Sequence, residues 1–182
     1  MIQEQGFFLN FKFKHMKKAI FFFLTAVFFM GCTTVPERWT KSSSEIDVAK
    51  GLVKDYQDAN WASWSSHYAD SAKLFHNSVD SITPQQLQDA FKMDNANYSK
   101  YGFIDKDSYF EMVTDDKNDK WVYFWGTWEG TLKNSNKKFL VPVHLATKFV
   151  NNKIVREYGY YNRSPLDMAI KEMQAANATP VK

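Results

Sequence analysis

Residues 120–132 read KWVYFWGTWEGTL, a run dense in aromatic side chains. Its aromatic residues are Trp121, Tyr123, Phe124, Trp125 and Trp128. Aromatic and β-branched residues favour strands, and successive side chains of a strand point to opposite faces of the sheet. One subset must therefore face the core, and the other must face the outside or a partner subunit. An outward aromatic row would be an unusual exposed patch.

Three further runs with strand character surround this one, over residues 101–114, 138–150 and 153–162. Short polar links join the later runs, through residues 134–136 and 151–152. The asparagines in these links tolerate the positive φ of tight hairpins. The pattern predicts an antiparallel sheet that is mostly a meander.

Helical spacing dominates before this region. The expected elements are a helix over 45–59, a short helix that carries Trp61, Trp64 and Tyr68, a strand over 72–76, and a helix from Pro84 to about residue 98. Thr83 can cap the last of these, with Pro84 at the first helical position and Gln86 closing a capping box. Ser164 and Pro165 open a final helix to about residue 176 by the same logic. The fold class is therefore α+β.

The N-terminal part of the chain has the features of a bacterial leader. Met16 is followed by Lys17, Lys18 and an apolar run over residues 20–30, interrupted only by Thr25. A bilayer-spanning helix needs about 20 apolar residues, so this run has the length of a secretory signal. Residues 29–32, Phe-Met-Gly-Cys, resemble the lipobox of bacterial lipoproteins.

The lipobox resemblance implies that Cys32 carries lipid and becomes the mature N-terminus, so that lipid on Cys32 is the membrane partner. Thr33 stands where some bacteria use aspartate for inner-membrane retention, which favours the outer membrane, facing the periplasm. Cys32 is the only cysteine, which excludes an intramolecular disulfide. Met1 to His15 precede the better start at Met16 and form an upstream extension.

The domain organisation follows from these boundaries. We expect an extension and signal peptide over 1–31, a lipidated cysteine and flexible tether over 32–44, a folded domain over 45–163, and a C-terminal helix and tail over 164–182. Residues 1–32 hold four of the 23 basic and one of the 20 acidic side chains, which leaves 19 of each. The mature chain is formally neutral, and nothing in its charge argues for nucleic acid.

The order of these elements resembles the NTF2-like, or SnoaL-like, α+β cone family. The likeness is carried by residues 59–70, 125–130 and 149–162. The resemblance implies N-terminal helices packed on a curved antiparallel sheet around a pocket, and often a homodimer formed through the sheet. Family membership alone does not give function, because members bind or catalyse.

The resemblance also directs attention to particular side chains. Ketosteroid isomerase-like members place a general base after the first strand and a tyrosine oxyanion donor on the first helix. Alignment puts His76 at the base position and Leu52 at the tyrosine position, with Tyr56 one turn further along. Asn162 stands where many SnoaL-like sequences carry an aspartate. Both family carboxylates are thus replaced.

We therefore expect a domain that binds a small, largely apolar ligand in an aromatic pocket. The expected pocket residues are Tyr56, His76, Trp125, His144, Tyr160 and Asn162. His144 lies on one face of its predicted strand, and Val141, Val143 and Leu145 lie on the other. His144 therefore faces either the pocket or the outside. The alternatives are a SnoaL-like isomerase or hydrolase with His76 as general base, and a protein-interaction module that uses the sheet face. No cofactor is expected, and no metal site, because converging ligands are not evident.

Overall fold

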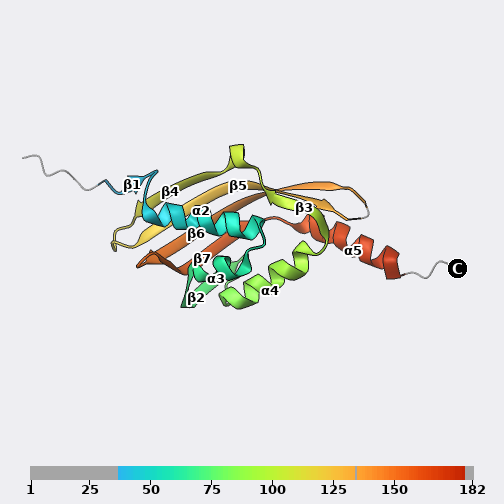
Figure 1. Ribbon diagram of the computed structural model, residues 1–182, viewed down its shortest axis with the longest axis horizontal. Helices are drawn as coiled ribbons and strands as arrows, with labels where there is room; N and C mark the ends of the chain where they lie inside the picture. The colour runs from blue at the N-terminus through green and yellow to red at the C-terminus, as the bar shows by residue number, and fades with distance from the viewer. Residues whose placement is uncertain (1–36, 134, 179–182) are drawn as a thin grey trace, which may run out of the picture. The chain divides into compact units, whose positions relative to one another are not determined.

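The computed structural model describes residues 37–133 and 135–178, with the backbone alone for residues 176–178 (Figure 1). Residues from Arg38 onward form one compact unit, which is the part described below. The expected upstream extension, signal peptide and lipidated Cys32 lie outside the described residues. In the described part of the chain, no helix is both long and apolar enough to cross a membrane.

Local capping signals fix where the helices begin. The hydroxyl of Ser43 accepts a hydrogen bond from the Ile46 backbone N–H at the start of α2 (Ser44–Gln57). The predicted capping box is present at α4 (Pro84–Asn95), where Thr83 and Gln86 bond reciprocally. The other helices are α3 (Trp61–Ser66) and α5 (Ser164–Ala178).

Seven strands form a single sheet. They are β1 (Trp39–Thr40), β2 (Tyr68–His76), β3 (Tyr98–Phe103), β4 (Tyr109–Thr114), β5 (Lys120–Leu132), β6 (Lys138–Val150) and β7 (Lys153–Tyr161). Their order is β1-β4-β5-β6-β7-β2. Strand β3 lies outside this path and pairs with the second half of β5, whereas β4 pairs with the first half. The helices α2, α3 and α4 lie on one face of the sheet (Figure 1). The α+β architecture predicted from the sequence is confirmed.

The sheet differs from the predicted meander in three places. Strand β2 begins at Tyr68 and pairs with β7 in parallel. This direction is possible because the two strands are far apart in the sequence and no hairpin joins them. The run over 101–114 is two strands, β3 and β4, separated by a 3-10 turn at Asp105–Asp107. Trp39 and Thr40, assigned to the tether from the sequence, pair with β4 as strand β1.

Strand β5 separates its aromatic residues by parity. Val122, Phe124, Trp128 and Leu132 are buried against the helices. Trp121, Tyr123 and Trp125 lie on the outer face, and Trp125 is 40% exposed. Ile46 and Leu52 of α2, Trp64 of α3 and Leu87 of α4 join the inward residues in one hydrophobic core. This core surrounds the cavity described next.

Candidate functional site

A cavity of about 90 Å³ lies between the helices and the inner face of the sheet. Its aromatic lining comprises Tyr56, Trp64, Tyr68, Phe91, Phe103, Trp128 and Tyr161. Its aliphatic lining comprises Leu52, Val53, Val141, Val143, Leu145 and Leu166. The remaining lining residues are His76, Asp94, Glu157 and Arg163. The volume is small beside the 300–1,000 Å³ typical of drug-sized ligands, so it suits a ligand of few atoms.

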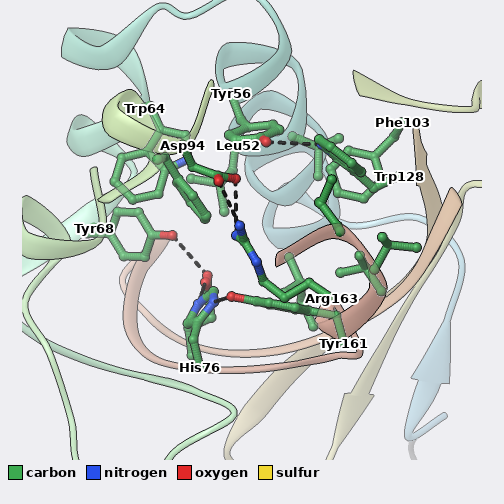
Figure 2. Close-up of a pocket in the computed structure, with 17 residues that line it drawn as sticks. Leu52, Tyr56, Trp64, Tyr68, His76, Asp94, Phe103, Trp128, Tyr161 and Arg163 are labelled. Atoms are coloured by element: carbon green, nitrogen blue, oxygen red, sulfur yellow. Dashed lines mark hydrogen bonds and ion pairs between the residues drawn. The ribbon is translucent and has the colours of Figure 1, made fainter. Parts of the chain in front are cut away.

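The polar end of the cavity is organised around the carboxylate of Glu157, which is only 2% exposed. The Tyr68 hydroxyl donates to Glu157 Oε2 at 2.9 Å, and His76 Nε2 lies 2.7 Å from Oε1. On the other side of its ring, His76 Nδ1 lies 3.1 Å from the Tyr161 hydroxyl. Figure 2 shows Tyr68, His76 and Tyr161 of this chain at the cavity wall. Because both ring nitrogens of His76 have partners, neither is free for a ligand.

Strand pairing builds this network. His76 is the last residue of β2 and lies opposite Gly159 of β7 in the parallel register. A Cβ atom at Gly159 would lie 2.7 Å from His76 Nδ1, so only glycine leaves room for the imidazole. Glu157 and Tyr161 flank Gly159 at alternate positions of β7 and therefore point to the same face.

The two tyrosines of the network stay protonated at neutral pH. Burial, and then the negative charge of Glu157, raise the pKa of Tyr68 well above its ordinary value. Burial also raises the pKa of Tyr161, although the Arg163 charge acts in the opposite direction. Tyr68 is therefore a hydrogen-bond donor to Glu157, and Tyr161 is a neutral phenol at the cavity.

A second polar pair lies at the cavity wall. Arg163, between β7 and α5, donates to both carboxylate oxygens of Asp94 in the last turn of α4, at 3.0 and 2.6 Å. Its Nε also donates to Asp167 at 2.7 Å. Burial alone would lower the pKa of Arg163, but the hydrogen bonds and charge of Asp94 raise it overall. The guanidinium thus remains charged and is occupied by two carboxylates, of which Figure 2 shows that of Asp94.

The hydroxyl of Tyr56 is used within the protein. It accepts a hydrogen bond from Trp128 Nε1 at 3.0 Å and lies 3.3 Å from Asn95 Oδ1, to which it donates. Burial raises the pKa of Tyr56 beyond its ordinary range. Tyr56 therefore contributes ring surface to the cavity, while its hydroxyl ties α2 to β5 and α4.

Comparison with known proteins gives the fold a name. No protein-family model matches the sequence, and no curated protein matches it either. Solved structures do match. A candidate SnoaL-like polyketide cyclase from Shewanella denitrificans is 11% identical, with a TM-score of 0.55 over 72% of this chain and 99% of that chain. The chain has the NTF2-like cone fold.

Other structures with this cone fold differ in what they are described as doing. IdmH from Streptomyces antibioticus, a candidate polyketide cyclase, is 9% identical, with a TM-score of 0.58 over 71% of this chain and 99% of that chain. A hypothetical protein from Catenulispora acidiphila with a ketosteroid isomerase-like fold, solved in complex with trimethylamine, is 14% identical, with a TM-score of 0.52 over 65% of this chain and 87% of that chain. At these identities the likeness concerns the fold alone.

The structure brings together only part of the set of pocket residues chosen from the sequence. Tyr56 and His76 line the cone cavity. Trp125, His144 and Tyr160 lie on the opposite face of the sheet, because their strands direct Phe124, Leu145 and Tyr161 inward. Asn162 is exposed after the end of β7, where its Oδ1 accepts from the Ser164 backbone N–H at the start of α5.

Five cavity residues with a hydroxyl, carboxylate or guanidinium group were not among the pocket residues chosen from the sequence: Tyr68, Asp94, Glu157, Tyr161 and Arg163. Both carboxylates expected from the family positions are absent, yet Glu157 and Asp94 bring two others to the cavity. The signal for Glu157 was its shared parity with Gly159 and Tyr161 at the end of the last strand. Within residues 37–133 and 135–178, no three His, Cys, Asp or Glu side chains gather in a way that could hold a metal ion.

Proposed function

We propose that this cone domain binds a small, largely apolar ligand in its cavity. The observation that carries the proposal is an internal space walled by aromatic and aliphatic side chains, with a few polar groups at one end. Ligand sites in proteins have this composition. The ligand would contact the aromatic and aliphatic walls and meet Tyr161 at the polar end.

Filling the cavity tests this function. Val143 lines the cavity, whereas Leu140 of the same strand is 57% exposed. The wild-type chain should be stabilised against heat by members of a panel of small apolar molecules, and Val143→Phe should abolish that response. Leu140→Phe, the matched control, should retain it. An unchanged response of Val143→Phe would place the ligand elsewhere and refute the proposal.

One observation favours an enzymatic alternative, a SnoaL-like isomerase or hydrolase. The linked Glu157, His76 and Tyr161 form a relay that can move a proton between the imidazole and the phenol. His76 would act through Tyr161, because both of its ring nitrogens are occupied. Tyr161→Phe should then abolish turnover of a ligand while leaving its affinity within about threefold. The small cavity favours binding over the cyclisation of a polyketide, whose carbon skeleton needs more space.

The cellular address stays a proposal that rests on the leader sequence. We infer that lipid on Cys32 holds the domain at the periplasmic face of the outer membrane. Labelled palmitate should be incorporated into the full chain and not into Cys32→Ser. If the mature wild-type chain and the Cys32→Ser variant were both found in the soluble fraction, this assignment would be contradicted.

The outer face of the sheet supports a further proposal, a homodimer or another protein partner. Tyr109, Trp125, His144 and Tyr160 lie opposite one another across four adjacent strands. Tyr109 and Trp125 are each 40% exposed, and Tyr160 is 54% exposed. Such an apolar row is a candidate interface. Trp125→Ala should lower the molecular mass measured by light scattering if a second copy covers the row.

A further inference from the structure

The charges at the cavity do not balance. Asp94 and Glu157 contribute two carboxylates, and Arg163 contributes one guanidinium, which leaves a formal charge of −1 when His76 is neutral. Arg163 does not compensate Glu157, because its three nitrogens donate to Asp94 and Asp167. In the described residues, the only ion-pair partner of Glu157 is His76.

Leaving Glu157 ionised and uncompensated is costly. Its side chain is 2% exposed, and a buried carboxylate without an opposite charge is strongly disfavoured. Two hydrogen bonds, from Tyr68 and His76, satisfy its oxygens but supply no net positive charge when the imidazole is neutral. A proton on His76 would supply that charge, and a cation inside the cavity would supply it equally well.

The cavity walls suit a cation better than a neutral molecule. Trp64, Trp128 and Phe91 line the same space as Glu157. Aromatic rings attract cations through the negative potential of their faces, and tryptophan does so most strongly. An anion would meet two carboxylates and find the guanidinium of Arg163 already occupied. The size of the cavity restricts the cation to a few atoms.

We propose that the ligand of this cavity is a small organic cation of the alkylammonium class, held by the aromatic walls and neutralising Glu157. The inference rests on the proposed ligand-binding function and specifies its chemistry. The cation takes the place of the opposite charge that Glu157 lacks when His76 is neutral.

Several groups surround the carboxylate that the cation would neutralise. His76 faces Glu157 and Tyr161 of β7 and the ring of Phe91 of α4. Tyr68 of β2 holds the other oxygen of Glu157. The Asp94 and Arg163 pair neutralises itself, so it supplies no charge to Glu157.

Three probes of one shape separate charge from size: tetramethylammonium, tert-butanol and pivalate. The full chain, purified in nonionic detergent, is titrated with each by calorimetry at neutral pH. Tetramethylammonium should bind at least about tenfold more tightly than tert-butanol, and pivalate more weakly than both.

Glu157→Gln tests the role of the charge, because it keeps the shape of the side chain, and its amide can accept from Tyr68 while donating to the other tautomer of His76. It should bind tetramethylammonium and tert-butanol equally, whereas Glu172→Gln on the exposed face of α5 should behave as wild type. Retained binding of tert-butanol shows that the Glu157→Gln variant is folded. If that variant does not fold, the preference of the wild-type chain for tetramethylammonium over tert-butanol decides.

The outcomes separate the two proposals. Equal binding of the cation and the neutral probe by the wild-type chain overturns the inference and leaves the proposed function standing. Tighter binding of pivalate overturns it in favour of an anion site at Arg163. Binding of none of the three probes refutes the alkylammonium proposal, and the proposed function is then decided by the separate panel of apolar molecules and the Val143→Phe variant.

Discussion

Replacing Tyr68 with phenylalanine removes one oxygen atom from a buried site and nothing else. That oxygen donates to Glu157 Oε2 at 2.9 Å, and the phenol is 5% exposed and the carboxylate 2%. A hydrogen bond to a charged group contributes about 1.5–3 kcal/mol. The cost of losing this one should lie in that range, because both partners are almost fully buried. We expect Tyr68→Phe to lower the free energy of unfolding by about 2 kcal/mol.

Urea unfolding followed by tryptophan fluorescence measures this loss. With a slope of about 2 kcal/mol per M, the midpoint should fall by about 1 M without a change in slope. Tyr160→Phe is the matched control, since Tyr160 lies on β7 near Glu157 but is 54% exposed. Its midpoint should not move measurably. A loss below about 0.5 kcal/mol in Tyr68→Phe would mean that Glu157 is not the charged acceptor assumed here.

Three other perturbations test separate parts of the domain. The pKa values of Tyr56 and Tyr68 are raised in the folded chain, so their contribution to stability should be fully present below about pH 10 and should fall at higher pH, where tyrosines of the unfolded chain ionise. Urea unfolding at about pH 8 and pH 11 measures this change. Equal stability at the two pH values would contradict the burial of these tyrosines. Asp94→Asn should cost about 1 kcal/mol, and less in high salt, because the Arg163 side chain is 31% exposed and partly screened; an effect insensitive to salt would argue against the ion pair. Thr83→Ala should remove the cap of α4 and cost about 1 kcal/mol, measured as a lower Tm.

Local signals explain what the sequence predicted well. The capping box at Thr83 and Gln86 acts within one turn, so its residues alone specify where α4 begins. The alternation in residues 120–132 likewise specifies which aromatic side chains share a face. What it does not specify is which face meets the helices, and the site residues on β6 and β7 depend on that choice. This is why Trp125, His144 and Tyr160 were grouped with the cavity.

Non-local pairing explains what was missed. Arg163 and Asp94 are 69 residues apart and meet only because α4 and the end of β7 converge on one cavity wall. Strand β2 was predicted to start late because Tyr68 continues the stripe of Trp61 and Trp64, while its parallel partner β7 lies far along the chain. A register shift between Lys148 and Phe149 alters the parity of the last hairpin, so an alternation count that starts at the hairpin does not place Glu157 inside, and only its parity with Gly159 and Tyr161 beyond the shift does.

The position of Glu157 also changes how His76 should be regarded. A general base needs a ring nitrogen that can reach the substrate, but His76 has Glu157 on one nitrogen and Tyr161 on the other. The imidazole therefore lies between two protein groups. It contacts the buried carboxylate of Glu157 and orients the phenol of Tyr161. Binding needs only that arrangement and an empty space beside it. Catalysis needs in addition that Tyr161 pass a proton between His76 and the ligand, so loss of turnover in Tyr161→Phe with retained binding is the result that would make the enzymatic alternative the better one.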